Sequence, residues 1–227
     1  MTTENAPVLA ILGGTGDLGT GLARRWAQAG YRVIIGSRTL EKAEAAVADL
    51  REVMADRGVS AVAVEAMANL DAATAADIVT LTVPFSHQVD TLNSVRDALR
   101  GKILIDVTVP LVPPRVARVQ LPPQGSAGQI AQELLGDEVA VVSAFQNVAA
   151  AHLQEGKGVE CDVLVSGNKK EAREAVITLV EAAGMRGFHA GMINNAAAAE
   201  ALTSVLISIN KQYGCHAGIK ISGLGDA

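Results

Sequence analysis

The feature that most constrains the fold is a glycine-rich turn near the N-terminus. Five glycines fall within the nine positions from 13 to 21, directly after an apolar run. The apolar run predicts a buried strand over Val8–Gly14. The next residues predict a helix over Asp17–Ala29 that Gly30 ends. Because glycine is costly to order, so many glycines at one turn indicate that something must approach this backbone closely.

The turn carries the motif Gly-x-Gly-x-x-Gly, as Gly14-Thr15-Gly16-Asp17-Leu18-Gly19. Between a strand and a helix, this motif is the fingerprint of a dinucleotide-binding site. We expect Gly14 to allow the tight turn, Gly16 to admit a pyrophosphate, and Gly19 to let the helix pack on the strand. The amides of the first helical turn would face the phosphates. The alternative, a glycine-rich turn without a ligand, is disfavoured by the strand–helix setting.

Apolar runs alternate with amphipathic stretches along the rest of the chain. This pattern predicts an α/β fold of Rossmann type, with a doubly wound parallel sheet buried on both faces. We expect a cofactor-binding domain over residues 1–152 and a small C-terminal α/β unit over 153–227 that completes the substrate cleft. The other expected strands are 31–38, 61–67, 77–84, 102–110, 138–145, 159–167 and 185–191. The other expected helices are 39–57 (with Thr39 as N-cap), 86–99, 126–135, 169–183 and 194–213.

The segment 111–125 interrupts this alternation with four prolines. Proline excludes a regular helix or a central strand there. The segment is therefore predicted to be an ordered loop near the active cleft or, as the alternative, a passive surface loop.

Composition excludes several classes of protein. The net charge is −5 without a basic block, and aromatic residues make up only 3%, so a nucleic-acid partner is not expected. The two cysteines, Cys161 and Cys215, have no metal-ligand spacing, so we expect no metal site and a reducing compartment. No signal peptide and no apolar run of about 18 residues is present, which favours a cytoplasmic protein without a membrane span.

The end of the second predicted strand indicates which dinucleotide binds. NAD sites usually carry Asp or Glu there, to bind the ribose 2′-hydroxyl. This chain has Ser37 and Arg38 instead, with Lys42 one helical turn later. A hydroxyl and two cations suit a 2′-phosphate, so NADP(H) is predicted. The alternative is that Arg38 and Lys42 are only solvated charges at a helix start.

The residues expected near the chemistry include no obvious acid–base pair. Val83, Pro84 and Phe85 follow the predicted strand 77–84 and would border the nicotinamide. His87 is either a substrate contact or a polar residue of a helix start, and Asp106, inside an apolar strand, either orients the loop or touches the site. Neither a Gly-x-Ser-x-Gly nor a Tyr-x-x-x-Lys motif occurs. Hydride exchange between two bound rings needs positioning rather than a catalytic side chain.

Several segments match one known family along nearly the whole chain. They are ILGGTGDLGTGLA, IIGSR, LTVPFSH, VVSAFQNVAA, CDVLVSGNKKEA and EALTSVLISINKQYGCHAGIKISGL. The chain resembles the NADPH-dependent reductases of the deazaflavin coenzyme F-420 (F420), or F-420:NADP oxidoreductases. The resemblance implies a homodimer that passes hydride reversibly between NADP(H) and F420. The residues expected to bind NADP(H) are Gly14, Thr15, Gly16, Asp17, Leu18, Gly19, Ser37, Arg38, Lys42, Thr82, Val83, Pro84 and His87. Those expected at the deazaflavin are Phe85, Val109, Gln146, Asn147 and Val148.

One position departs from the family pattern. Members often have histidine where this chain has Gln146, which can form hydrogen bonds but cannot carry charge. Two other functions therefore stay open. One is an NADPH-dependent reductase of another small acceptor, such as an imine, a carbonyl, a flavin or a metal chelate. The other is a non-catalytic NADPH-binding sensor.

Overall fold

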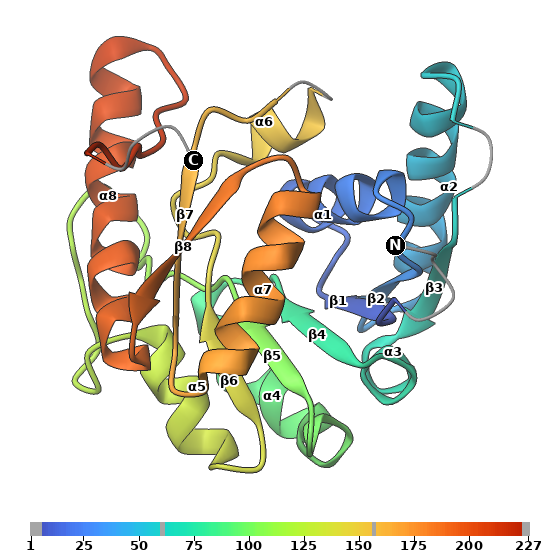
Figure 1. Ribbon diagram of the computed structural model, residues 1–227, viewed down its shortest axis with the longest axis horizontal. Helices are drawn as coiled ribbons and strands as arrows, with labels where there is room; N and C mark the ends of the chain where they lie inside the picture. Colours follow the sequence, from blue (N-terminus) through green and yellow to red (C-terminus); the bar gives the residue numbers. More distant parts are fainter. Residues whose placement is uncertain (1–5, 60–61, 156–157, 224–227) are drawn as a thin grey trace.

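The computed structural model describes residues 6–59, 62–155 and 158–223 (Figure 1). Eight strands form a single sheet in the order β3-β2-β1-β4-β5-β6-β7-β8. The strands are β1 (Leu9–Leu12), β2 (Val33–Ser37), β3 (Val64–Ala68), β4 (Ile78–Leu81), β5 (Ile103–Asp106), β6 (Ala140–Ser143), β7 (Asp162–Gly167) and β8 (Arg186–Gly191). The α-helices are α1 (Asp17–Gln28), α2 (Leu40–Asp56), α3 (Asn69–Ala75), α4 (Gln88–Val95), α5 (Ala127–Leu135), α6 (Ala150–Gln154), α7 (Lys170–Ala182) and α8 (Ala196–Tyr213). Short 3-10 helices cover η2 (Phe85–His87), η3 (Arg96–Leu99) and η4 (Ile193–Asn195).

The predicted Rossmann-type α/β class is confirmed. Successive residues of β1 belong to different core clusters: Leu9 and Ile11 lie in the one that includes Trp26, whereas Ala10 and Leu12 lie in the other. The sheet is therefore buried on both faces, as continuous apolar strands predict. It is not wholly parallel, however, because β7 pairs antiparallel with β6. Apolar runs do not encode strand direction, so the sequence could not reveal this reversal.

The strand order reverses at β1, which lies between β2 and β4. In doubly wound sheets, ligands bind outside the carboxyl ends of the strands at such a point. The turn after β1, the start of α2 and the end of β4 therefore meet at one crevice.

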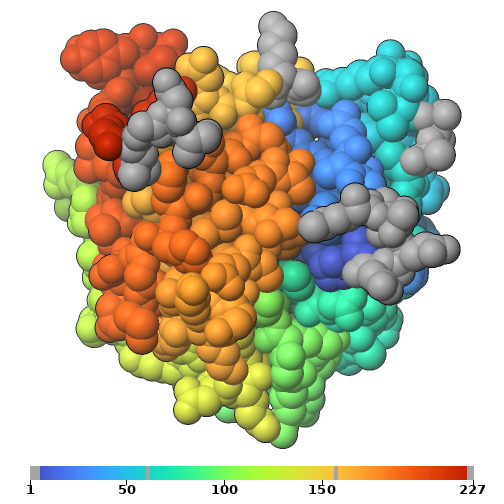
Figure 2. Space-filling view, in the orientation of Figure 1, coloured from blue at the N-terminus to red at the C-terminus, as the bar shows by residue number. Residues whose placement is uncertain are grey.

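The C-terminal part continues the same sheet and shares its core. The indole of Trp26 on α1 donates to the carbonyl of Leu179 on α7 at 2.8 Å, and its ring meets Phe145 edge-on at 6.0 Å. Figure 2 shows α7 (orange) lying against α1 (blue) at the surface. The division of the chain at residue 152 stays a prediction.

Several local expectations differ from the structure. The helices α3 and α6 were not predicted, and the expected helix 86–99 consists of η2, α4 and η3. Thr39 lies at the N-cap of α2, but its side chain forms no capping bond. Residues 111–125 contain no helix or strand, as their prolines predict. Residue 61, the first of an expected strand, lies outside the described residues. None of the described helices is long and apolar enough to cross a membrane.

Candidate functional site

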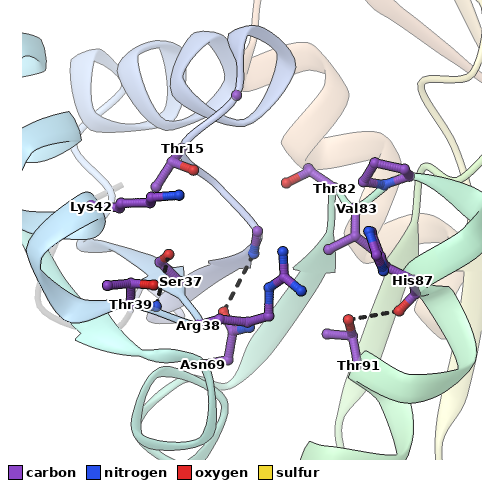
Figure 3. A pocket seen from close by; sticks show the side chains of 13 residues that line it. Thr15, Ser37, Arg38, Thr39, Lys42, Asn69, Thr82, Val83, His87 and Thr91 are labelled. Carbon is purple, nitrogen blue, oxygen red and sulfur yellow. Dashed lines mark hydrogen bonds between the residues drawn. The ribbon is translucent and has the colours of Figure 1, made fainter.

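The first of two clefts lies at the crevice where the strand order reverses. It encloses about 610 Å³ and is formed by the turn after β1, the β2–α2 junction, the start of α3 and the segment after β4 (Figure 3). We call it the cofactor cleft. Its lining residues are Gly13, Thr15, Gly16, Ser37, Arg38, Thr39, Lys42, Asn69, Thr82, Val83, Pro84, His87 and Thr91.

Each glycine of the turn has a distinct steric environment. Gly13 has the left-handed φ of +67° at the tight turn, and a Cβ on Gly14 would lie 2.7 Å from the Ile11 carbonyl oxygen, so both positions suit glycine. A Cβ on Gly19 would lie 2.6 Å from the Cα of Gly14, so the predicted close packing at Gly19 is present. A Cβ on Gly16 would meet nothing within 4 Å. The backbone at Gly16 therefore faces open space in the cofactor cleft.

The helices α1 and α2 both begin at this cleft without a side-chain cap. Gly16 precedes α1 and has no side chain, and Thr39 precedes α2 but does not accept from its amides. The first amides of a helix have no partner within the helix, and they form the positive end of its dipole. The uncapped N-terminal ends of α1 and α2, which carry partial positive charge, therefore both border the cofactor cleft.

The predicted NADP-selecting residues come together at the second of these ends. The Ser37 hydroxyl is buried and accepts from the Thr39 amide at 3.3 Å. Arg38 and Lys42 are exposed and extend into the cleft (Figure 3). Within the described part of the chain, neither side chain forms an ion pair or a hydrogen bond. Their charge is therefore available to a ligand.

Asn69 was not predicted as a site residue. It is the first residue of α3 and is only 8% exposed, and its Oδ1 accepts from the Gly13 amide at 3.4 Å (Figure 3). It thus holds the tight turn from the opposite side of the cleft. A polar residue two positions after the predicted strand 61–67, at the carboxyl edge of the sheet, is the signal that could have found it.

A second cleft of about 520 Å³ adjoins the first, and we call it the acceptor cleft. The two share Thr82, Val83 and Pro84. One wall follows β4 and the other follows β5 and includes part of the proline-rich loop, so this loop does lie at the cleft. The lining residues, mostly apolar, are Leu18, Thr82, Val83, Pro84, Phe85, Ser86, Val107, Thr108, Val109, Leu111, Val112, Pro113 and Val116. Phe85 and Val109, both expected at the deazaflavin, therefore line the second cleft.

Three residues expected at the deazaflavin lie behind these surfaces instead. The Gln146 amide donates to the Asp106 carbonyl and to the Ser143 hydroxyl, at 2.8 Å each. The Asn147 amide donates to the Ala199 carbonyl at 2.8 Å. Neither residue, nor Val148, lines either cleft. Their direct role in binding stays a prediction, as does that of Asp17, which lines a separate groove beside α1 and α2.

Asp106 is wholly buried at the end of β5. Burial raises the pKa of its carboxyl, whereas hydrogen bonds from Thr108 and Gln88 lower this pKa by a smaller amount. The Thr108 amide donates to Oδ1 at 2.9 Å, and the Gln88 side-chain amide donates to Oδ2 at 2.5 Å. Among the residues that the structure describes, no three His, Cys, Asp or Glu side chains gather as a metal site would require.

Comparisons with known proteins agree with this geometry. The family model described as NADP oxidoreductase, coenzyme F420-dependent, matches residues 8–110. The F420-dependent NADP reductase of Methanocaldococcus jannaschii is 40% identical over 222 residues, covering 95% of this chain and 98% of that protein. The reductase of the same name from Methanothermobacter thermautotrophicus is 40% identical over 223 residues, covering 95% of each chain. A crystal structure of a candidate F420-dependent NADP reductase from Arthrobacter sp. FB24 has a TM-score of 0.81 at 26% identity, covering 96% of this chain and all of that one. The chain belongs to the family of F420-dependent NADP reductases.

Proposed function

We propose that this protein transfers hydride reversibly between NADP(H) and the deazaflavin coenzyme F420. The observation that carries the proposal is the junction of two unlike clefts. A polar, cationic cleft suited to a dinucleotide meets a mostly apolar cleft suited to a planar ring, and the two share Thr82, Val83 and Pro84. Relatives that carry this activity in their names are 40% identical to the chain over nearly its whole length.

The residues present fit NADP(H). The open backbone at Gly16 and the uncapped start of α1 would hold the pyrophosphate. Ser37, Arg38 and Lys42, at the uncapped start of α2, would hold the 2′-phosphate through charge-assisted hydrogen bonds. His87, at the edge of the cofactor cleft, is proposed as a further contact.

The chain contributes to the chemistry by positioning and by excluding water. Thr82, Val83 and Pro84, shared by the two clefts, would border the nicotinamide, which would supply or accept the hydride. Val83 and Pro84 would border one ring, and Phe85 and Val109 would border the other. An apolar enclosure of this kind orients two rings face to face and keeps water from the reacting carbons. No side chain of the protein is needed as proton donor to those carbons.

The C-terminal part is proposed to support the acceptor cleft from behind. The Ser204 hydroxyl on α8 donates to the carbonyl of Arg118 in the proline-rich loop at 3.3 Å. The Thr203 hydroxyl donates to the Gln146 carbonyl at 2.9 Å. The helix α8 thus contacts both the loop and the turn after β6.

The protein is also proposed to be a homodimer. Val205 and Tyr213 on α8 are 44% and 76% exposed, and a second copy would cover such apolar side chains. Light scattering of the purified protein should give about twice the 23.4 kDa mass of one chain. A monomer at micromolar concentration would contradict this part of the proposal.

The function is tested by mixing the protein with NADPH and oxidised F420 and following the visible absorbance of the deazaflavin. We expect enzyme-dependent bleaching with NADPH and a much slower reaction with NADH. Bound NADPH without bleaching would contradict the proposal, and imines, carbonyls and flavins would then be tested as acceptors.

A further inference from the structure

The acceptor cleft opens where two neighbouring strands separate. The β4–β5 ladder ends with Leu81 opposite Asp106. The next residue after β4, Thr82, continues the pairing of β4 with β1: its amide and hydroxyl both donate to the Leu12 carbonyl at 3.0 Å. On the other side, the Val107 amide still donates to the Leu81 carbonyl at 3.3 Å. Beyond these bonds, backbone pairing no longer fixes the separation of the two walls.

The Asp106 carboxylate connects the two walls at this point. One oxygen accepts from the amide of Thr108, which lies in the wall after β5. The other accepts from the side chain of Gln88, the first residue after the turn Phe85–His87. That turn belongs to the wall after β4. Gln88 also donates to the Ala127 carbonyl at 2.9 Å, which fixes its side chain against α5.

This connection is made of groups that are costly to bury. Asp106 and Gln88 are both fully buried, and within the described residues no Lys or Arg pairs with Asp106. Asp106 instead interacts electrostatically with another acid, Glu200. A buried carboxylate without a cation lowers stability relative to an apolar side chain of similar size. Its presence at the junction of the walls therefore points to a role other than stability.

We infer that Asp106 and Gln88 are positioning residues that set the separation of the acceptor-cleft walls, and so the distance between the two rings. The inference rests on the proposed function. It differs from direct binding, because neither side chain lines the acceptor cleft. Hydride transfer is sensitive to such spacing, since a misplacement of about 1 Å can lower a rate by about 100-fold.

The first test compares Gln88→Leu with Gln132→Leu. The control Gln132 donates to two carbonyls, those of Gly136 and Val139, at the far end of α5. For Gln88→Leu we expect kcat for NADPH-dependent F420 reduction to fall on the order of 10- to 100-fold. The kinetic isotope effect with deuterated NADPH should rise, and the Kd of NADPH should stay within about twofold. Gln132→Leu should change none of these.

The second test exchanges donor and acceptor. Asp106→Asn alone places an amide N–H group against the Gln88 donor, so it should lower kcat as Gln88→Leu does. Adding Gln88→Glu provides an acceptor for that amide, and the pair should recover part of the lost rate. Rescue by the double variant would not follow if each residue only supported local folding.

Hydrogen exchange gives a readout that does not depend on turnover. Protection of residues 82–87 and 107–112 should fall in Gln88→Leu and Asp106→Asn, but not in Gln132→Leu. If kcat, isotope effect and exchange at these walls all stay as in the unmodified protein, the inference is wrong. If the unmodified protein fails to reduce F420 while the exchange result holds, only the proposed function fails.

Discussion

Gly19, in the first turn of α1, packs so closely on Gly14 that a Cβ on Gly19 would lie 2.6 Å from the Gly14 Cα and 2.7 Å from its carbonyl oxygen. Both contacts are with backbone, which cannot move aside as a flexible side chain can. Gly16, three residues earlier, has open space around its Cβ position. The same motif therefore contains one glycine required by the fold and one that the fold alone does not require.

This difference predicts opposite results for two matched variants. Gly19→Ala should lower the free energy of unfolding by about 1–3 kcal/mol or more, because it overpacks the strand–helix turn. Gly16→Ala should keep the melting temperature close to that of the unmodified protein, since its φ of −87° suits alanine. It should nevertheless weaken NADPH binding at least about tenfold by blocking approach of the pyrophosphate. Thermal melts and NADPH titrations measure both effects, and unchanged NADPH affinity in Gly16→Ala would exclude this glycine as the contact.

Arg38→Ala tests the selection of NADP over NAD. Loss of a charge-assisted hydrogen bond should weaken NADPH binding by about 1.5–3 kcal/mol, while NADH binding barely changes. Titration of both nucleotides gives the two dissociation constants. The exposed Arg96, on η3, provides the control as Arg96→Ala. An equal loss for NADPH and NADH would show that Arg38 does not recognise the 2′-phosphate.

The strands predicted from the sequence extend beyond those observed, for a reason related to the site. Residues 78–84 are continuously apolar or β-branched, and residues 103–110 are so apart from Asp106, yet β4 ends at Leu81 and β5 at Asp106. The remaining residues leave the ladder and line the clefts, where apolar side chains are needed for a ring. Hydropathy cannot distinguish burial in a sheet from burial beside a cleft, so the pattern extended the predicted strands beyond their observed ends.

Other features needed three-dimensional information. The Gln88–Asp106 bond joins residues 18 apart on different elements, and neither residue belongs to a motif. The helices α3 and α6 are short, and neither has a capping side chain that would reveal its start. Gln146 could be singled out by resemblance, but the sequence did not indicate that its amide binds the Asp106 backbone rather than facing a cleft.

Asn69→Ala should affect both nucleotides alike. The Asn69 Oδ1 accepts from the Gly13 amide at the tight turn. Asn69 is uncharged and is separate from Arg38 and Lys42, the two cations near the start of α2. Losing this support should loosen the pyrophosphate turn, so the affinities for NADPH and NADH should fall by a similar factor. That pattern is the opposite of the one expected for Arg38→Ala. A loss confined to NADPH would place Asn69 at the 2′-phosphate instead.

We expect Glu200 on α8 to make the stability of the protein depend on pH. Its carboxylate oxygens accept from the Ala127 and Gly128 amides at 2.6 and 3.0 Å, at the start of α5. Burial raises the pKa of Glu200 from 4.5 to about 8 despite these two bonds, and the nearby Asp106 adds to the rise. At pH values between 4.5 and about 8, Glu200 therefore keeps its proton in the folded protein but has lost it in the unfolded chain.

The free energy of unfolding should therefore decrease as pH rises from about 5 to 8, by up to about 1.4 kcal/mol for each pH unit, and should level off above that range. Urea unfolding at pH 5.5, 7 and 8.5 measures the slope. Glu200→Gln removes the titrating group and should reduce the slope, but it should also lower stability at every pH, because its NH2 group faces one of the two amide donors. Glu133→Gln, at an exposed carboxylate on α5, is the control and should keep the slope. If Glu200→Gln also kept the slope of the unfolding free energy against pH, Glu200 would be ionised throughout this range, held by the two α5 amides. The pH dependence would then have to come from another group.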